Sequence, residues 1–333
     1  MIAFFPGQGS QFVGMGKDLY NDFPVAKQTF EEASDALKLN VSKLCFEGPE
    51  SDLTLTENTQ PCLLTTSVAA FRVAQMEFGF KPAAVAGHSL GEYSALVAAG
   101  SLQLAVAVRW VKERGAAMQR AVPAGEGTMA AVLGLEDEKV TTICEAATKA
   151  AIAKRSSGET PTQLSVEAIV QPANFNAPGQ VVIAGSTDAV ATAVELIKAG
   201  TVVPGGKAIP LQVSAPFHCT LMSPARDRMA QLFADTQPDH RPKPLACPYV
   251  PNRTARLTQE PGLVFELLTE QVDHPVLWRQ SIVTFLQAGH TVAIEFGPGK
   301  VLQGLAKRIS FEDKTLKVTS CGSTENIRTF ESL

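Results

Sequence analysis

The chain has 333 residues, of which 45% are hydrophobic, and it carries a formal net charge of −4 with a pI of about 5.8. This charge balance provides no basic stripe and argues against general nucleic-acid binding. The length suits one large domain, or a large domain with a small one, and the apolar share suffices for a sizeable core.

The cysteines show no C-x-x-C spacing, which favours free or buried thiols in a reducing compartment over disulfides or a zinc site. The first five residues run directly into Pro6 and Gly7, without the basic start and long apolar segment of a signal peptide. No apolar run approaches the ~18 residues of a transmembrane helix. We therefore expect a cytoplasmic protein with no membrane partner. The six cysteines are Cys45, Cys62, Cys144, Cys219, Cys247 and Cys321.

Strands and helices alternate in the N-terminal part of the chain. A short buried strand is predicted at Ile2–Phe5, followed by a glycine-rich loop at residues 6–11 and a helix from about Met15. The loop is neither a Walker loop nor G-x-G-x-x-G, so it is either a tight connection or a loop whose amides line a site. Helical patterns follow at 22–38 and 61–78, the second opening at a proline, which the first helical turn favours.

The most informative motif lies at residues 83–93. An apolar run ending at Gly87 predicts a strand, and the pattern from Leu90 to Ala99 predicts a helix. Between them stands Gly-His-Ser-Leu-Gly, the G-x-S-x-G of a nucleophile elbow, which would expose the Oγ of Ser89 at a strained corner. The N–H of Leu90 would then point to where an oxyanion forms. The alternative is a glycine-rich turn with an idle serine.

The next predicted helix runs from Leu104 to about Val122, because apolar residues recur along one face. Arg114 and Lys112 lie on its two flanks, each about 80° from the centre of that face by the 100° step. Either side chain could point along the edge of a site, and periodicity does not choose between them. A surface salt bridge is the alternative for both.

The pattern changes after a boundary at residues 123–127. Predicted strands and helices follow in the order βαββαβ, which is the ferredoxin-like signature. The segment 154–161 is polar and is expected to be an exposed, mobile loop. The strands are predicted at 128–133, 165–170, 181–184 and 207–213, and the helices at 137–154 and 188–198.

Residues 214–219 mark the return to the large domain. A last buried strand is predicted at Val292–Phe296, and the final twenty residues carry little signal. Together the elements predict an α/β fold, in which a large parallel-sheet, hydrolase-like domain holds an inserted ferredoxin-like small domain. The large domain is assigned to residues 1–125 and 209–333, and the small domain to 126–208.

A serine nucleophile needs a base within hydrogen-bond reach, about 2.6–3.2 Å. His218 is the candidate, because it lies at the predicted domain junction, where a cleft would be lined. The remaining histidines fit packing, capping or solvated positions: His88, His240, His274 and His290.

Several motifs together resemble the malonyl-CoA:acyl carrier protein transacylases. They occur in the family's order, from residue 2 to about 309, and several long motifs are more specific than any one. The segment around 154–165 departs from the family by its greater length. The matching segments are residues 5–11, 59–61, 87–93, 113–115 with 118–119, 174–180, 216–218 and 297–302.

The resemblance implies that Ser89 is the acylated nucleophile and that His218 is the base and then the acid. The backbone N–H groups of Leu90 and Gln8 would form the oxyanion hole. Asn252 would help to orient His218 through its main chain.

The resemblance also resolves the choice left by periodicity. Arg114 would hold the free carboxylate of a malonyl group, which a planar guanidinium suits better than Lys112 would. Phe217 would contact the acyl α-carbon.

The implied reaction is a ping-pong transfer of malonyl from malonyl-CoA to the phosphopantetheine thiol of acyl carrier protein, in fatty-acid or polyketide synthesis. It requires no metal and no redox cofactor, because thioesters and an ester are close in energy. The expected state is a monomer. Lys300, Lys307 and Arg308 are candidate contacts for an acidic carrier protein.

Three other functions remain open at this point. An α/β-hydrolase would pair Ser89 with His290, and Asp273 would complete its chain order. A Ser-Asp lipid hydrolase is disfavoured because the chain contains no Asp-Gly. A degenerate acyl-binding module is disfavoured by the intact Ser89, His218 and Arg114.

Overall fold

The structure, a computed structural model, describes residues 1–158 and 164–328, and the chain divides into two compact units. The first unit comprises Met1–Ala116, Gln231–Leu267 and Ser281–Leu333, and the second comprises Ala117–Ala230 and Leu268–Gln280. The second unit thus contains the predicted 126–208 insertion together with flanking segments. The domain boundaries drawn from the sequence stay a prediction.

A five-stranded parallel sheet forms the centre of the first unit, in the order β11-β8-β1-β2-β7. Every residue of β1 and β2 is buried, as parallel strands covered on both faces require. The predicted parallel sheet is therefore confirmed. Its strands are β1 (Ile2–Phe5), β2 (Val85–Gly87), β7 (Tyr249–Val250), β8 (Val292–Phe296) and β11 (Lys317–Cys321).

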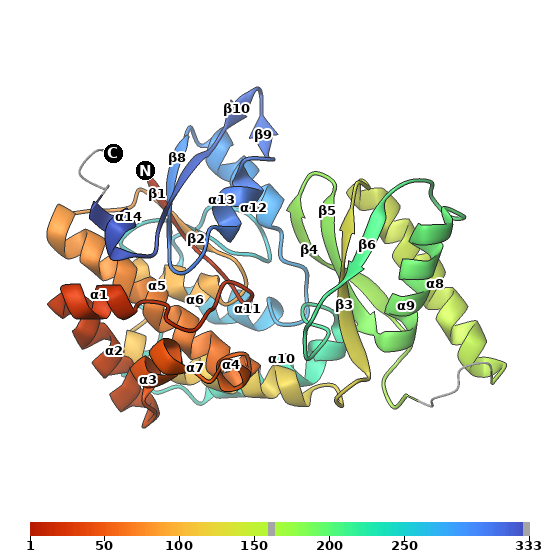
Figure 1. The fold of residues 1–333 in the computed structure, drawn as a ribbon, viewed down its shortest axis with the longest axis horizontal. Helices are drawn as coiled ribbons and strands as arrows, with labels where there is room; N and C mark the ends of the chain where they lie inside the picture. Colours follow the sequence, from red (N-terminus) through yellow and green to blue (C-terminus); the bar gives the residue numbers. More distant parts are fainter. Residues whose placement is uncertain (159–163, 329–333) are drawn as a thin grey trace. The chain divides into compact units, whose positions relative to one another are not determined.

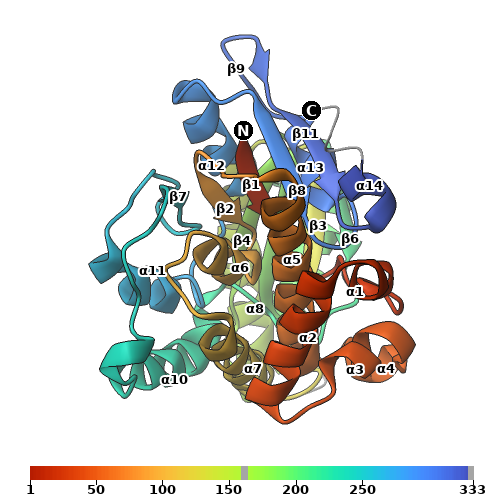
Figure 2. The ribbon, with the colours of Figure 1, turned by 90° about the vertical axis from the view of Figure 1, so that its left-hand side faces the viewer.

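Helix α5 is the long helix of the first unit, and α2 packs along it (Figures 1 and 2). Phe71 of α5 meets Phe5 and Phe296 of the sheet, with ring centroids 5.8 and 5.4 Å apart. The helices wholly within this unit are α1 (Lys17–Asp22), α2 (Pro24–Leu37), α3 (Val41–Glu47), α4 (Glu50–Leu53), α5 (Thr56–Phe78), α6 (Gly91–Ala98), α13 (Val301–Ala306) and α14 (Thr324–Arg328).

The predicted start of α5 at Pro61 is wrong, because the helix begins at Thr56 and contains the proline. The amides of Asn58 and Thr59 already bond to the carbonyl of Leu55. Pro61 stands just past the first turn, where it removes a single intrahelical bond.

Four more helices have residues in both units, and a short hairpin follows α13. The predicted helix at 104–122 is confirmed as α7. These elements are α7 (Leu104–Arg120), α10 (Ser223–Ala234), α11 (Val264–Glu270), α12 (Trp278–Gln287), β9 (Ser310–Phe311) and β10 (Lys314–Thr315).

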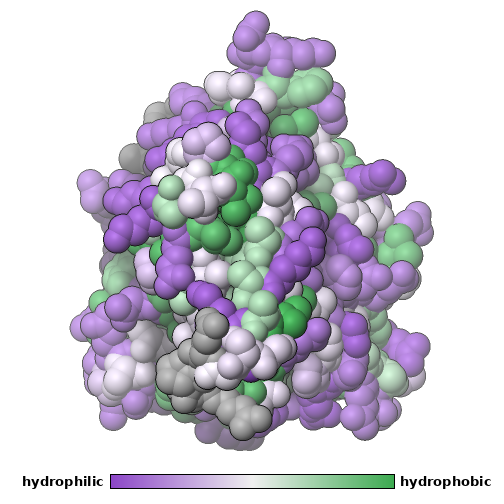
Figure 3. Space-filling model, turned by 90° about the vertical axis from the view of Figure 1, so that its right-hand side faces the viewer, coloured by the Kyte–Doolittle hydropathy of each residue, from purple (hydrophilic) through white to green (hydrophobic). Residues whose placement is uncertain are grey.

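The second unit contains an antiparallel sheet in the order β4-β5-β3-β6, with α8 and α9 packed on one face (Figure 1). The chain order β3-α8-β4-β5-α9-β6 confirms the ferredoxin-like prediction. Hydrophilic side chains cover much of the surface on the side of α8 and α9 (Figure 3). The elements are β3 (Gly127–Leu133), α8 (Asp137–Ser156), β4 (Val170–Ala177), β5 (Gln180–Ser186), α9 (Thr187–Ala199) and β6 (Lys207–Pro210).

The strand predicted at 165–170 is shifted in the structure, where β4 occupies Val170–Ala177. Pro172 and Asn174 are residues that strands disfavour, so the sequence does not indicate a strand here. The ladder to β5 changes register between them and so accommodates the proline. The segment 154–161 is not wholly a loop, because α8 continues to Ser156. The rest of that prediction falls partly on residues 159–163, which lie outside the described residues. Within the described chain, no helix combines the length and apolarity needed to cross a membrane.

Candidate active site

Four loops of the first unit leave neighbouring parallel strands at the same edge of the sheet. Residues 6–11 follow β1, the elbow follows β2, Asn252 comes soon after β7, and residues 297–300 follow β8. The carboxyl ends of parallel strands lie together, which is where α/β sheets place their sites. A Cβ at Gly7 would stand 2.5 Å from the carbonyl oxygen of His88, and one at Gly297 2.9 Å from the Pro6 ring. The motifs therefore form one contiguous loop cluster.

Ser89 occupies the corner between β2 and α6 with φ of 51°, the left-handed region that side chains seldom adopt. Glycine is required on both sides of it. A Cβ at Gly87 would overlap the backbone of Gly91, and one at Gly91 would overlap the carbonyl of Phe5. The predicted strand, sharp turn and helix are all present, which is the geometry of a nucleophile elbow.

Arg114 reaches the serine from α7. Its Nη2 donates to the Oγ of Ser89 at 3.1 Å, and its Nη1 donates to Oε1 of Gln60 on α5 at 2.9 Å. The side chain is only 1% exposed, and burial lowers the pKa of its guanidinium. Its neighbour Gly115 lets α7 approach the start of α5 closely, since a Cβ at position 115 would stand 2.6 Å from the carbonyl oxygen of Thr56. Of the two flank residues left open by periodicity, Arg114 is the one bonded to Ser89.

Two backbone amides in the loop cluster remain available to a ligand. Among the described residues, the N–H groups of Leu90 and Gln8 have no protein acceptor. The Gln8 side chain is exposed and donates to Thr56 Oγ1 at 3.3 Å. Helix α6 begins directly after Leu90, so the Leu90 amide lies at the positive end of the helix dipole. These are the donor types that an oxyanion hole uses.

His218 belongs to the second unit, where it also has a left-handed backbone, with φ of 62°. Its Nδ1 lies 2.9 Å from the carbonyl oxygen of Gln271. A carbonyl only accepts, so Nδ1 carries the hydrogen, and neutral His218 keeps its lone pair on Nε2. The imidazole and the ring of Phe217 are buried. This is the tautomer that a general base needs.

The orienting role predicted for Asn252 is corrected by these contacts. The carbonyl bonded to the imidazole belongs to Gln271, while the Asn252 side chain bonds to the elbow, accepting from Ser89 N–H and donating to the Gly87 carbonyl. No side-chain pattern indicates Gln271 in the sequence, because it acts through its main-chain carbonyl.

The groups of the hydrolase alternative have other partners. Asp273 is buried and accepts from Arg226 Nη1 at 2.8 Å and from Ser223 Oγ at 3.2 Å. His290 packs its ring against Phe285 at a centroid distance of 6.0 Å, and its partial burial lowers its pKa. Neither residue is arranged as a triad member by these contacts.

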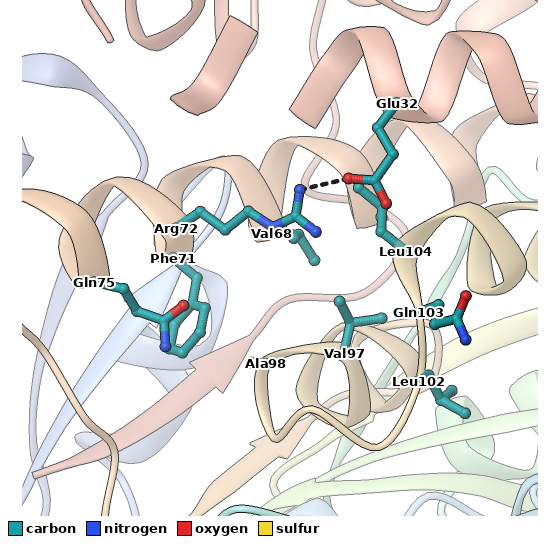
Figure 4. A pocket seen from close by; sticks show the side chains of 10 residues that line it. All are labelled: Glu32, Val68, Phe71, Arg72, Gln75, Val97, Ala98, Leu102, Gln103 and Leu104. Atoms are coloured by element: carbon teal, nitrogen blue, oxygen red, sulfur yellow. Dashed lines mark hydrogen bonds and ion pairs between the residues drawn. The ribbon is translucent and has the colours of Figure 1, made fainter. Parts of the chain in front are cut away.

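A separate hollow of about 250 Å³ lies between α2, α5 and the end of α6 (Figure 4). Its charged lining residues, Arg72 and Glu32, pair with each other at 2.7 Å. Val68 and Phe71 add apolar surface. None of the predicted site residues lines this hollow, so the candidate site is the loop cluster around Ser89.

Comparison with known proteins agrees with this geometry. The family model for the acyl transferase domain matches residues 4–157. The malonyl CoA-acyl carrier protein transacylase of Bacillus subtilis strain 168 is 44% identical over 320 residues, which cover 96% of this chain and 93% of the relative. The chain belongs to the malonyl CoA-acyl carrier protein transacylase family. This confirms the resemblance inferred from the motifs and makes the chain an acyltransferase.

Solved structures of the transacylase family match the whole chain. An acyl-carrier-protein S-malonyltransferase from Burkholderia pseudomallei is 40% identical, with a TM-score of 0.87 over 100% of this chain and 99% of the other. A malonyl-transacylase in complex with a type II PKS acyl-carrier protein is also 40% identical, with a TM-score of 0.87 over 98% of this chain and 97% of the other. The fold class predicted from the sequence is thus confirmed at full length.

Proposed function

We propose that this chain transfers a malonyl group from malonyl-CoA to the phosphopantetheine thiol of acyl carrier protein, through a malonyl ester on Ser89. The observation that carries the proposal is the buried Arg114 guanidinium bonded to Ser89 Oγ. A buried cation beside a nucleophile favours an acyl group that brings its own carboxylate, since an unpaired buried charge is costly.

In the first half-reaction, Ser89 Oγ attacks the thioester carbonyl while His218 Nε2 takes the hydroxyl proton. The carbonyl oxygen becomes an oxyanion, which the N–H groups of Leu90 and Gln8 stabilise. When the intermediate collapses, the C–S bond breaks, His218 returns the proton to the sulfur, and CoA leaves as the thiol. Malonyl remains on Ser89 as an ester.

In the second half-reaction, the phosphopantetheine thiol replaces CoA. His218 takes the thiol proton, the sulfur attacks the ester carbonyl, and the same two amides hold the oxyanion. The C–O bond to Ser89 then breaks, and His218 returns the proton to Oγ. Gln271 keeps the imidazole in the required tautomer throughout, through its carbonyl bond to Nδ1.

Acyl selectivity follows from two buried side chains. Arg114 would pair with the malonyl carboxylate through both of its Nη groups, so acetyl-CoA, which has no carboxylate, should react poorly. Phe217, next to His218, would contact the acyl α-carbon and disfavour a methyl branch. A single methyl is worth about 1–3 kcal/mol in a pocket, so this second preference is partial.

The carrier protein would dock on exposed basic residues at α13. Lys300 precedes this helix, and Lys307 and Arg308 follow it. The solved complex of a related transacylase with its acyl-carrier protein supports a partner of this kind. Higher salt should therefore slow transfer to the carrier more than hydrolysis of the acyl-enzyme by water.

We also propose that the protein acts as a cytoplasmic monomer. All six cysteines are free and buried, which supports a reducing compartment. Sedimentation at micromolar concentration tests the monomeric state.

Following both half-reactions separately tests the proposed function. Purified protein is incubated with malonyl-CoA, freed of CoA, and then mixed with holo acyl carrier protein. We expect CoA release in the first step, equimolar with the protein, and malonyl on the carrier in the second. Stoichiometric CoA release followed by free malonate, with none on the carrier, would make the protein a thioesterase instead.

A further inference from the structure

The nucleophile motif contains a carboxylate that the reaction above does not use. Glu92, the second residue of α6, is completely buried. Burial of an ionised carboxylate is costly unless hydrogen bonds or a counterion compensate it. Its Oε2 accepts from the backbone N–H of Asn252 at 3.0 Å. Glu92 therefore holds the chain at a point 160 residues away, just beyond β7.

Asn252 in turn contacts both sides of the elbow. Its Oδ1 accepts from the N–H of Ser89 at 2.6 Å, and its Nδ2 donates to the carbonyl of Gly87 at 2.6 Å. One side-chain amide thus bridges two backbone groups that flank the strained corner. Both bonds are short, and Asn252 is itself completely buried.

We propose that Glu92 and Asn252 are a pair of positioning residues that hold Ser89 in its reactive conformation. The inference rests on the nucleophilic role that the proposed function gives to Ser89. A left-handed backbone at a residue other than glycine is strained and persists only where surrounding contacts impose it. Glu92 fixes the Asn252 backbone, and Asn252 fixes the corner, so the conformation of Ser89 depends on both.

Glu92 also acts electrostatically on Arg114. The negative charge of Glu92 raises the pKa of the Arg114 guanidinium, against the larger lowering that burial causes. Burial raises the pKa of the Tyr93 and Tyr249 hydroxyls, and the charge of Glu92 adds a smaller increase, so both hydroxyls are neutral. The charge and the hydrogen bond of Glu92 are therefore separable by the substitution Glu92→Gln.

A small uncharged fluorophosphonate probe tests the pair without malonyl-CoA, because it reports only how readily a serine reacts. Asn252→Ala and Glu92→Ala should each slow phosphonylation of Ser89 by about 10–100-fold, since a displacement near 1 Å can cost 10²-fold. The double variant should be no slower than the slower single variant, as expected of residues that act as one unit. Glu92→Gln, which keeps an acceptor oxygen for the Asn252 N–H, should stay within about threefold of wild type.

Gln259→Ala is the matched control, because Gln259 lies in the same stretch and donates to the Leu245 carbonyl at 3.0 Å, away from the elbow. It should react at the wild-type rate. If Asn252→Ala does not fold, Asn252→Asp replaces it: the carboxylate still accepts from Ser89 N–H but cannot donate to Gly87, and a slowing of about 3–10-fold is expected.

A folded Asn252 variant that reacts like wild type would overturn the pairing, as would a double variant whose slowing is the product of the two single effects. The proposed function fails separately. A wild-type protein that reacts with the probe but acquires no malonyl from malonyl-CoA would contradict the substrate and leave the positioning pair intact.

Discussion

The loops around Ser89 in the first unit and the helix-covered core of the second unit bury different kinds of side chain. The first unit encloses Glu92, Arg114 and Glu295, each at most 1% exposed, close to the loops that follow its parallel strands. In the second unit, the core between α8, α9 and the sheet consists of apolar residues. The difference indicates that the first unit buries ionisable groups, which carry a desolvation cost, whereas the core of the second unit is an apolar scaffold for the loop that carries His218.

The largest effect on the transfer rate is expected from replacing His218 in the second unit. His218→Ala should lower transfer by about 10²–10⁴-fold, because it removes the group that we propose as both base and acid. The control His290→Ala should keep most of the activity, since His290 packs on Phe285. Steady-state transfer rates measure both variants. The opposite ranking would favour the hydrolase alternative.

A second prediction removes a buried charge from the first unit. Arg114→Ala should lower kcat/KM for malonyl-CoA by about 10²-fold, the scale expected when a buried carboxylate loses its partner. It should also raise the relative use of acetyl-CoA, because no unpaired guanidinium remains. Competition between the two thioesters measures this change. Full discrimination against acetyl-CoA in the variant would transfer the carboxylate-binding role to another residue, with Lys112 the next candidate.

A substitution in the apolar core of the second unit should instead lower stability and leave transfer nearly unchanged. Ile143→Ala empties a completely buried position and should lower the free energy of unfolding by about 2–5 kcal/mol. Below its unfolding transition, the variant should transfer malonyl within about twofold of wild type. Urea unfolding and the transfer assay measure the two effects. A folded Ile143→Ala protein with strongly reduced transfer would show that this core is not merely a scaffold.

Glu295 should make the stability of the first unit depend on pH. Burial raises the pKa of its carboxyl to about 7, against hydrogen bonds from the Leu302 and Gln303 amides that lower it. The folded state therefore holds this proton more tightly than the unfolded chain, and the stabilisation is complete below about pH 4.3 and is lost as pH rises through 7.

Glu295→Gln stays neutral, so its free energy of unfolding relative to wild type should rise by up to about 3 kcal/mol between pH 5 and pH 8. Urea unfolding of both proteins at the two pH values measures this difference. A difference that does not change with pH would mean that Glu295 titrates alike in both states.

The elbow could be predicted from the sequence because sterics leave it few alternatives. Glycine is required at positions 87 and 91, where any Cβ would overlap neighbouring backbone. Arg114 is predicted only in part from the residues. The periodicity of α7 places both Arg114 and Lys112 on its flanks, and only the family resemblance favours Arg114.

Other features act through backbone groups, which side-chain patterns do not reveal. Gln271 contributes a carbonyl, and any residue could supply one. Strand β4 was predicted too early because a register shift accommodates Pro172. Strand β11, at the edge of the parallel sheet, is not predicted, because its alternation of polar and apolar residues is short. Its pairing with β8 forms only in the folded chain and leaves no pattern in the sequence.

The central claim is that Ser89 carries the malonyl group between two thiols. Wild-type protein and Ser89→Ala are exposed to malonyl-CoA, digested and mapped by mass spectrometry. We expect one malonyl adduct on the wild-type peptide that contains Ser89, which disappears when holo acyl carrier protein is added, and none on the folded variant. An adduct of equal yield on Ser89→Ala, or a wild-type adduct on another residue that the carrier protein removes, would contradict the assignment.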